Sequence, residues 1–365
     1  MDQQLPVVTV ILGAGASRDV SYARGGEGCS GGDLGPKMPS PLDNDFFDLL
    51  QQLEAQTQAG TTKEAMKRII DKVLHWSGDP LWQSMEKMFC SLHVSAVLGH
   101  KLFAPELKDP AKELVNDFLS SIRALLNEAH GTRACFKHHM ILQNLFGEDA
   151  VMTFNYDFVV ERMFAGPPGR KPINTYPFGE WFYGFCERPK DTPIHIPTLY
   201  ELHGSVNWEL REDEHGEVKD ARKSWPSTWG ELAREIDYSV TGRLGCDSDA
   251  NWRAPVLLPY WDKRIEKGLW LKIWKAAAAQ LRRTSGLIVW GYLLPTTDLK
   301  ARELLRLAFE APEAKLRKVT VIDPSRETQD RWRRMFLSRQ FWRFDSYEEF
   351  DEYRIQHGAN LDAFR

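Results

Sequence analysis

Cysteine is scarce and scattered in this chain of 365 residues. The five cysteines contain no Cys-x-x-Cys pair and are Cys29, Cys90, Cys135, Cys186 and Cys246. This spacing argues against a four-cysteine zinc site and against a disulfide framework. We interpret most of the cysteines as small buried apolar residues, and we expect no bound metal.

Long apolar runs and a strong excess of one charge are also missing. No uninterrupted apolar stretch approaches the ~20 residues that span a bilayer, so we expect no membrane partner. The start of the chain, MDQQLPVVTVILGAG, has no basic segment and leads straight into a glycine turn. This favours a core strand over a signal peptide, and a cytoplasmic location is the default expectation. A net charge of −4 argues against a generic polyanion binder.

Five segments share one design, in which a predicted strand ends in small or polar residues. These endings are GAGAS after residues 7–12, TFNYD at 153–157, LHGS at 202–205, GYLLPTTD at 291–298 and IDPS at 322–325. Alternation of buried strands with helices predicts an α/β fold with a Rossmann-like, doubly wound parallel sheet. Ligands of such sheets bind outside the carboxyl ends of the strands, where these polar residues are expected.

A helical pattern without strand signals covers about residues 62–146. Its apolar residues recur at spacings of three and four over Lys63–Trp76, Leu81–Leu98, Ala111–His130 and Phe136–Phe146. We therefore predict a helical insertion at 61–146 in a nucleotide-binding domain formed by 1–60 and 147–365.

Several further boundaries are expected from local signals. Asp43 is a plausible cap for a helix over Asp43–Ala55, and Gly286 is expected to end a helix that starts near Leu269. Asp298 is expected to cap the helix that starts at Leu299. The polar, charged stretch 211–249 is interpreted as an excursion from the main fold.

The polar residues at the strand ends allow two interpretations each. Glycines after a first strand let backbone N–H groups approach a phosphate, but they also serve simple strand–helix turns. Asp157 could belong to a ligand site or cap the following helix. His203 has the side chain best suited to accept a proton near neutral pH, although it could instead be hydrogen-bonded within a turn.

Four of these motifs together resemble the sirtuin-like fold, in the variant found in bacterial antiphage-defence NADases. They are Gly13–Ser17, Thr153–Asp157, Leu202-His203-Gly204 and Gly291-Tyr292, within about residues 7–325. The chain departs from protein deacetylases in lacking their four-cysteine zinc module. It also has Phe154 where they have glutamine, and Met38–Leu42 is only the nearest match to their Gly-Ile-Pro-Asp-Phe-Arg segment.

The resemblance implies roles for individual residues. Asn155 would hold the nicotinamide ribose and a water, Asp157 would orient the nicotinamide side or the loop that carries Asn155, and His203 would be the general base. The pyrophosphate would lie against Ala14, Gly15 and Ser17, and Asp323 would bond the adenine ribose. The full expected NAD+-binding set is Gly13, Ala14, Gly15, Ser17, Gly291, Tyr292, Asp298 and Asp323.

The resemblance also implies an activity, namely NAD+ glycohydrolysis that yields nicotinamide and ADP-ribose, in an antiviral abortive-infection effector. NAD+ would be the substrate. Because uncontrolled NAD+ loss kills a cell, we expect a homo-oligomer or an activating partner such as an NTPase, a nucleic-acid sensor or a phage protein. The alternatives are an NAD-dependent protein deacylase and a non-catalytic module that binds NAD or ADP-ribose. A Rossmann dehydrogenase is disfavoured, because Arg18 interrupts the glycine fingerprint.

Overall fold

The structure is a computed structural model that describes part of the chain. The described residues are 6–19, 38–75, 84–88, 110–130, 135–157, 159–165, 196–205, 208–212, 218–223, 252–253, 268–358 and 360–365. Most of the predicted helix at 81–98 lies outside them. So does the segment 255–259, for which the sequence PVLLP predicts a short strand.

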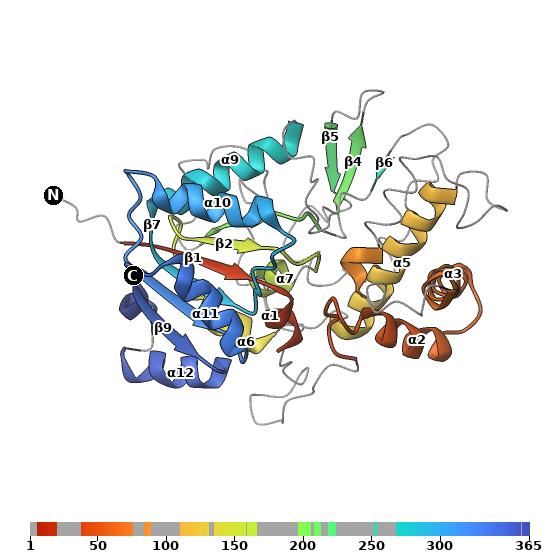
Figure 1. Cartoon of the computed structure of the whole chain (residues 1–365), viewed down its shortest axis with the longest axis horizontal. Coiled ribbons are helices and arrows are strands. Elements are labelled where there is room, and N and C mark those ends of the chain that lie inside the picture. Colours follow the sequence, from red (N-terminus) through yellow and green to blue (C-terminus); the bar gives the residue numbers. More distant parts are fainter. Residues whose placement is uncertain are drawn as a thin grey trace.

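A six-stranded, all-parallel sheet forms the centre of the fold (Figure 1). Its strands are β1 Val7–Leu12, β2 Ala150–Thr153, β3 Thr198–Glu201, β7 Thr284–Trp290, β8 Lys318–Ile322 and β9 Gln340–Phe344. They lie in the order β3-β2-β1-β7-β8-β9. The chain therefore winds outward from β1 in one direction and from β7 in the other, which confirms the predicted α/β, Rossmann-like sheet.

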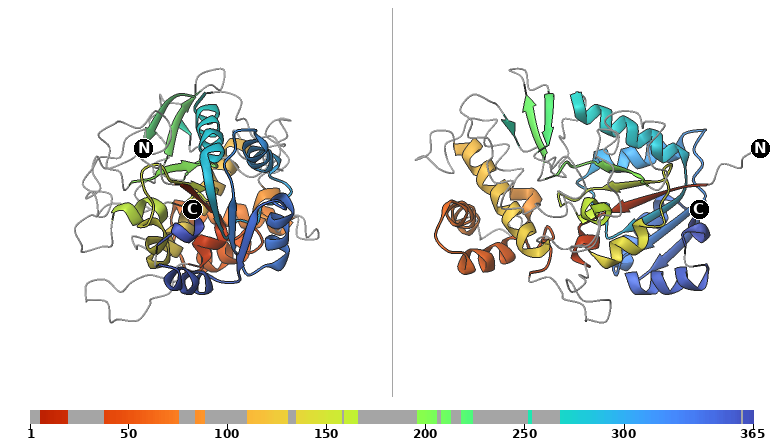
Figure 2. Two further views of the ribbon diagram at one scale, coloured as in Figure 1. Left: turned by 90° about the vertical axis from the view of Figure 1, so that its left-hand side faces the viewer. Right: turned by 180° about the vertical axis from the view of Figure 1, so that it is seen from behind.

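The central strands are mainly apolar, and both of their faces are covered. Every residue of β1, β2 and β7 is buried, whereas the edge strand β9 has exposed positions. Helices lie on both sides of the sheet, as the end-on view of Figure 2 shows. The helices that flank it are α6 Phe136–Leu142, α7 Val159–Ala165, α9 Gly268–Arg283, α10 Leu299–Glu310, α11 Arg326–Met335 and α12 Tyr347–Gln356.

A separate group of helices lies beyond the carboxyl ends of the strands (Figure 1). It consists of α2 Phe46–Gln56, α3 Thr61–His75 and α5 Pro110–His130. The ring centroids of Phe46 and Phe118 lie 5.3 Å apart and join α2 to α5. The short helix α1, Ala14–Arg18, follows β1 and connects the two parts, since the Arg18 guanidinium lies 2.7 Å from the Asp45 carboxylate. The predicted domain boundaries at 60/61 and 146/147 stay a prediction.

A second, smaller sheet is antiparallel and overlaps the stretch that was expected to be an excursion. It consists of β4 Trp208–Glu212, β5 Val218–Lys223 and β6 Trp252–Arg253 in the order β5-β4-β6. Strands β4 and β5 pair with each other and not with the six-stranded sheet, so the predicted excursion at 211–249 contains paired strands at its start. The polar composition of these strands concealed them, since strand prediction depends on apolar alternation.

Three predicted boundaries need correction. Asp43 does not cap α2; the N-cap position is Asp45, and Asp43 instead accepts hydrogen bonds from the Ser84 hydroxyl and the Glu86 amide. Helix α6 ends at Leu142, four residues earlier than predicted (146 − 142). Gly286 does not end α9 but lies inside β7, where an added Cβ would stand 1.8 Å from the Phe364 carbonyl oxygen.

A buried ion pair lies at the amino-terminal ends of the strands of the sheet. The Arg365 guanidinium donates to both carboxylate oxygens of Asp149, at 3.0 and 2.7 Å. Asp149 also accepts the backbone N–H groups of Val8 and Phe146, so one carboxylate joins the start of β1 to the end of the chain. The C-terminus accordingly lies beside the start of β1 in Figure 1.

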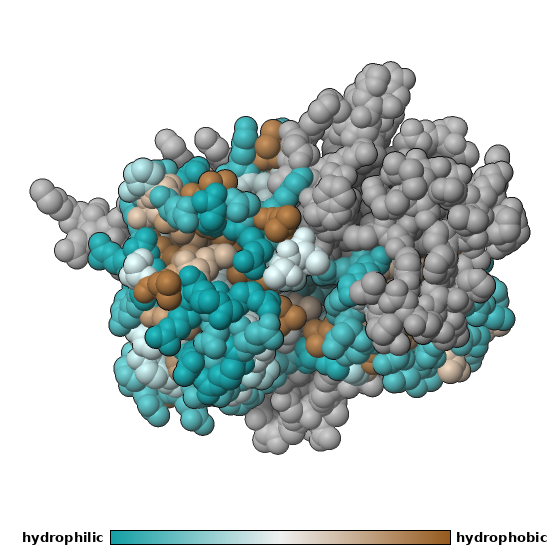
Figure 3. All heavy atoms as spheres, in the orientation of Figure 1, coloured by the Kyte–Doolittle hydropathy of each residue, from teal (hydrophilic) through white to brown (hydrophobic). Residues whose placement is uncertain are grey.

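The described surface is mainly hydrophilic, with separate hydrophobic spots on the face drawn in Figure 3. The large hydrophobic side chains that are exposed are Phe146, Leu293, Leu299, Leu307, Leu337 and Ile355. Among the helices that the structure describes, none has the length and apolar character that crossing a membrane requires.

Candidate functional site

Two glycine turns meet where the winding of the sheet reverses. Strands β1 and β7 are neighbours, and the turns that follow them place Gly13 and Gly15 against Gly291. A Cβ on Gly291 would lie 2.1 Å from the Ala16 nitrogen, and its φ of +63° favours glycine. This reversal point is where doubly wound sheets bind their ligands.

The backbone amides of the first turn are mostly engaged within the protein. Gly13 donates to the Trp290 carbonyl, Gly15 to the Gly291 carbonyl and Ala16 to the Gly13 carbonyl. Within the described part of the chain, the amide of Ala14 has no hydrogen-bond partner, and this residue is exposed. Ala14 is therefore the position in this turn whose N–H is available to a ligand.

A buried polar network joins this turn to the end of β2. The Asn155 side-chain nitrogen donates to the Gly13 carbonyl at 3.0 Å and to the Ser17 hydroxyl at 2.8 Å. Ser17 in turn donates to the Asp157 carboxylate at 2.6 Å. The second carboxylate oxygen of Asp157 accepts the amide of Val159, the first residue of α7, so Asp157 also contacts the start of that helix.

These contacts fix the orientation of the Asn155 amide. A backbone carbonyl can only accept, so the atom that faces Gly13 must be the NH2 group. Both amide hydrogens are then used, and within the described residues the side-chain oxygen Oδ1 accepts no hydrogen bond. Asn155 therefore presents a rigidly held acceptor at the carboxyl end of β2.

A second network joins the end of β3 to the loop after β7. The His203 ring nitrogen Nε2 lies 2.9 Å from Oδ2 of Asp298, and both side chains are at most 2% exposed. The Tyr292 hydroxyl donates to the same oxygen at 3.3 Å, and Oδ1 of Asp298 accepts the Ala301 amide at the start of α10. The predicted cap is confirmed, and Asp298 is in addition the partner of His203. Burial, followed by the Asp298 carboxylate, raises the pKa of Tyr292 well above its usual value.

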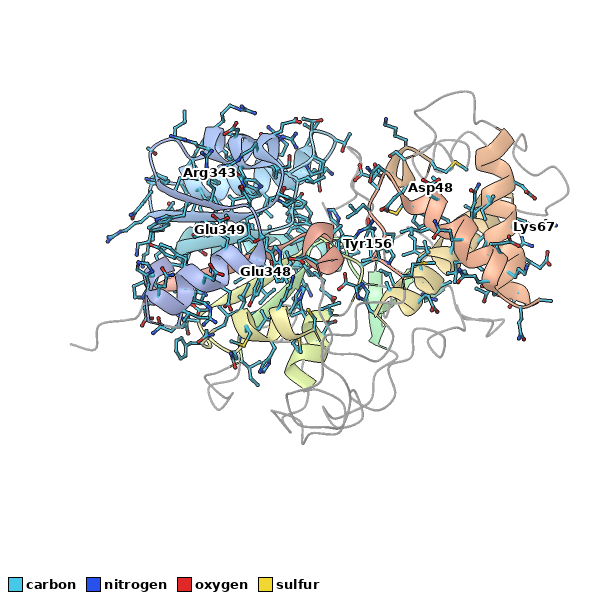
Figure 4. All side chains as sticks on the ribbon, turned by 90° about the horizontal axis from the view of Figure 1, so that it is seen from below. Asp48, Lys67, Tyr156, Arg343, Glu348 and Glu349 are labelled. Carbon is cyan, nitrogen blue, oxygen red and sulfur yellow. The ribbon has the colours of Figure 1, made fainter. Side chains whose placement is uncertain are left out.

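Aromatic rings connect the two networks. Phe154 stacks on Tyr292 with ring centroids 4.1 Å apart and meets His203 edge-on at 5.0 Å. Tyr156 stacks on His203 at 6.1 Å. Figure 4 shows Tyr156 between the sheet and the group of helices that carries Asp48 and Lys67. The end of β2 thus faces the junction of the two parts.

Asp323 lies at the end of β8 and belongs to neither network. Its carboxylate accepts the Ser325 amide at 2.8 Å. Burial raises the pKa of Asp323, which the Ser325 amide and Arg331 partly oppose. Its expected contact with a ribose stays a prediction.

One buried histidine close to the first network, His138, was not among the predicted site residues. His138 lies behind the turn, with its ring 4.6 Å from that of Trp290 and its Nδ1 3.1 Å from the Cys135 sulfur. Burial lowers the pKa of His138 to about 3, against the opposing charge of Asp157. The proximity of His138 to Asp157 depends on tertiary packing and has no local sequence signal.

The predicted residues thus fall into two connected groups and one separate position. Gly13, Ser17, Asn155 and Asp157 share the first network, and Tyr292, His203 and Asp298 share the second. In the described part of the chain, no group of three or more His, Cys, Asp or Glu side chains has an arrangement that could hold a metal ion. Neither the models of known protein families nor the curated proteins contain a match to this chain.

Proposed function

We propose that this protein binds NAD+ across the meeting point of the two glycine turns and hydrolyses its nicotinamide–ribose bond. The observation that carries the proposal is the fixed Asn155 amide, whose oxygen is held beside the turn while both of its hydrogens bond the protein. A second acid–base element, the His203–Asp298 pair, lies on the adjacent strand end. A glycohydrolase needs these two elements beside a dinucleotide.

Support for dinucleotide binding comes from topology and the turn. The strand order places the reversal point between β1 and β7, and glycine turns that pack backbone on backbone follow both strands. The Ala14 amide is available to a phosphate oxygen there. A pyrophosphate at this position would direct the rest of the ligand toward the ends of β2 and β3 on one side, or β8 on the other.

The chemistry requires little beyond positioning. The carbon–nitrogen bond to nicotinamide breaks, and its electron pair neutralises the pyridinium as the sugar becomes oxocarbenium-like. Water attacks the anomeric carbon and passes a proton to His203, giving nicotinamide, ADP-ribose and one proton. The Asn155 oxygen accepts a hydrogen bond from the ribose or from the attacking water, which orients the reacting atoms.

Such an activity must be controlled in a living cell. The proposal therefore includes a switch, either self-association or an activating protein partner, and an antiviral role is the setting that the sequence resemblance suggests. Assays are best run over a wide range of protein concentration, since an activity that depends on oligomerisation rises more steeply than linearly.

The test is release of nicotinamide from NAD+, followed by chromatography. Wild type is compared with Asn155→Asp, Asn155→Ala and His203→Ala. Asn144→Asp is the matched control, because Asn144 also donates to a backbone carbonyl, that of Met140, but lies outside the site. We expect wild type and the control to release nicotinamide and the site variants to lose at least ~100-fold in rate. Folded wild type that binds NAD+ by calorimetry without turnover would contradict hydrolysis and favour a binding module.

A further inference from the structure

We propose that Asp298 is a positioning residue that holds His203 in the tautomer with its proton on Nε2, so that Nδ1 carries the lone pair that takes the proton. This inference rests on the proposed hydrolysis. It assigns to Asp298 a role other than contact with the nucleotide, which was its role in the sequence prediction.

Asp298 is firmly fixed in space. Its side chain is fully buried, and it accepts hydrogen bonds from Ala301, Tyr292 and His203. The Ala301 amide holds Oδ1, which leaves Oδ2 to face the imidazole. A carboxylate with both oxygens engaged cannot rotate without breaking a buried contact.

The direction of the hydrogen bond follows from the partner groups. An ionised carboxylate only accepts, so Nε2 of His203 must donate. In a neutral imidazole the other nitrogen then carries the lone pair. Asp298 therefore decides which nitrogen of His203 can act as a base.

Packing prevents the ring from exchanging its two nitrogens. Phe154 meets the imidazole edge-on at 5.0 Å, and Tyr156 stacks on it at 6.1 Å. A rotation that exchanged the two ring nitrogens would break the buried contact between Nε2 and Asp298. Phe154 and Tyr156 hold the plane of the imidazole, and Asp298 determines which ring nitrogen points toward it.

The same loop also forms the ligand turn. Gly291 at its start packs against Gly15, and Asp298 at its end bonds His203. The Tyr292 carbonyl accepts the Trp332 indole N–H at 2.9 Å and anchors the loop between these points. One loop thus contacts both His203 and the turn that would hold the nucleotide, so it fixes the position of one relative to the other.

Two substitutions separate the contact with His203 from the capping of α10. Asn and Ser both cap helices well, so Asp298→Asn and Asp298→Ser should keep the Ala301 contact. In Asp298→Asn the amide NH2 faces Nε2 and donates, which places the histidine proton on Nδ1. We expect kcat to fall about 10³–10⁴-fold with KM within a few-fold, as a wrong tautomer does in other histidine-dependent enzymes. In Asp298→Ser the ring loses its partner, and we expect a smaller loss of about 10–100-fold.

A readout independent of turnover is the ¹⁵N spectrum of the imidazole, with the His203 signals identified by their disappearance in His203→Gln. We expect wild type to show a protonated Nε2 and Asp298→Asn a protonated Nδ1. Asp43→Asn is the control, since Asp43 also accepts several hydrogen bonds but none from a histidine among the described residues. An unchanged tautomer in Asp298→Asn, or a kcat no lower than that of the control, would overturn the assignment. Absence of hydrolysis by wild type would overturn the proposed function, while the spectra would still decide the tautomer.

Discussion

Ser17 donates its hydroxyl hydrogen to Asp157 across the gap between α1 and the end of β2, with the two oxygens 2.6 Å apart. The same hydroxyl oxygen accepts the Asn155 side chain at 2.8 Å. Asn155 is therefore oriented by a residue that lies 138 positions earlier in the chain. The ends of β1 and β2 form one hydrogen-bonded unit.

Removing this hydroxyl should affect both stability and turnover. Ser17→Ala leaves the buried Asp157 carboxylate without one donor, so we expect the free energy of unfolding to fall by about 1–3 kcal/mol. Asn155 loses an acceptor, and nicotinamide release should slow. Urea unfolding and the NAD+ assay measure the two effects. Ser346→Ala removes a helix-capping hydroxyl that belongs to neither network of the candidate site; equal kinetic effects of the two changes would refute the link.

Gly291 should not tolerate alanine. Its φ is +63°, which costs an L-residue about 1–2 kcal/mol, and the added Cβ would also collide with the α1 turn. Gly358→Ala is the control, because it has a φ of +115° but no atom closer than 3.6 Å to the added Cβ. We expect Gly291→Ala to weaken NAD+ binding by calorimetry and Gly358→Ala to leave it unchanged. Equal affinities would mean that the contact between the two turns is irrelevant to the ligand.

The Arg365–Asp149 ion pair lies at the opposite ends of the strands from the candidate site. Its loss should therefore affect stability and not turnover. Arg365→Ala leaves the Asp149 carboxylate buried without its cation, which costs about 3–5 kcal/mol for such pairs. Arg326→Ala breaks a pair with Asp345 whose side chains are 57% and 51% exposed, so we expect ~1 kcal/mol or less. Denaturant unfolding of both variants measures the difference. Comparable losses would show that Asp149 does not depend on Arg365.

His138 should make the fold sensitive to mild acid. Its pKa of about 3 when folded lies below the ~6.5 of an unfolded chain, so unfolding takes up a proton below pH 6.5. Its contribution to stability is complete above that pH and is lost as the pH falls toward 3. Between pH 7.5 and 5, wild type should lose about 2 kcal/mol more than His138→Phe. The exposed histidine in His357→Gln serves as control, and parallel pH profiles of wild type and His138→Phe would contradict the assignment.

The parallel sheet could be predicted because its strands carry their own signal. The strand at residues 7–12 was predicted with the observed bounds, since an apolar run buried on both faces is distinctive even without its neighbours. Gly286 was misinterpreted because its role depends on a contact with a distant part of the chain. Glycine near a helix end usually marks its termination, but here the small residue admits the Phe364 carbonyl, and that approach depends on the distant end of the chain.

The site was only partly predictable. Each strand ending was recognisable, and the parallel topology brings them to one edge. The pairing of His203 with Asp298 was not, because 95 residues separate them and Asp298 already had a sufficient local explanation as a helix cap. Asp298 has two structural roles, and only its role as a helix cap can be inferred from the neighbouring sequence.

The position of β1 in the sheet has a consequence for synthesis of the chain. Val8 pairs with Gly286, which is 278 positions later (286 − 8). At about 5–20 residues per second, a ribosome needs roughly 15–55 s to supply that partner. Throughout this interval the apolar strand VVTVIL has at least one unpaired edge and lacks the helices that follow residue 268. Because this apolar strand is unpaired during synthesis, we expect the nascent chain to aggregate more readily than the folded protein.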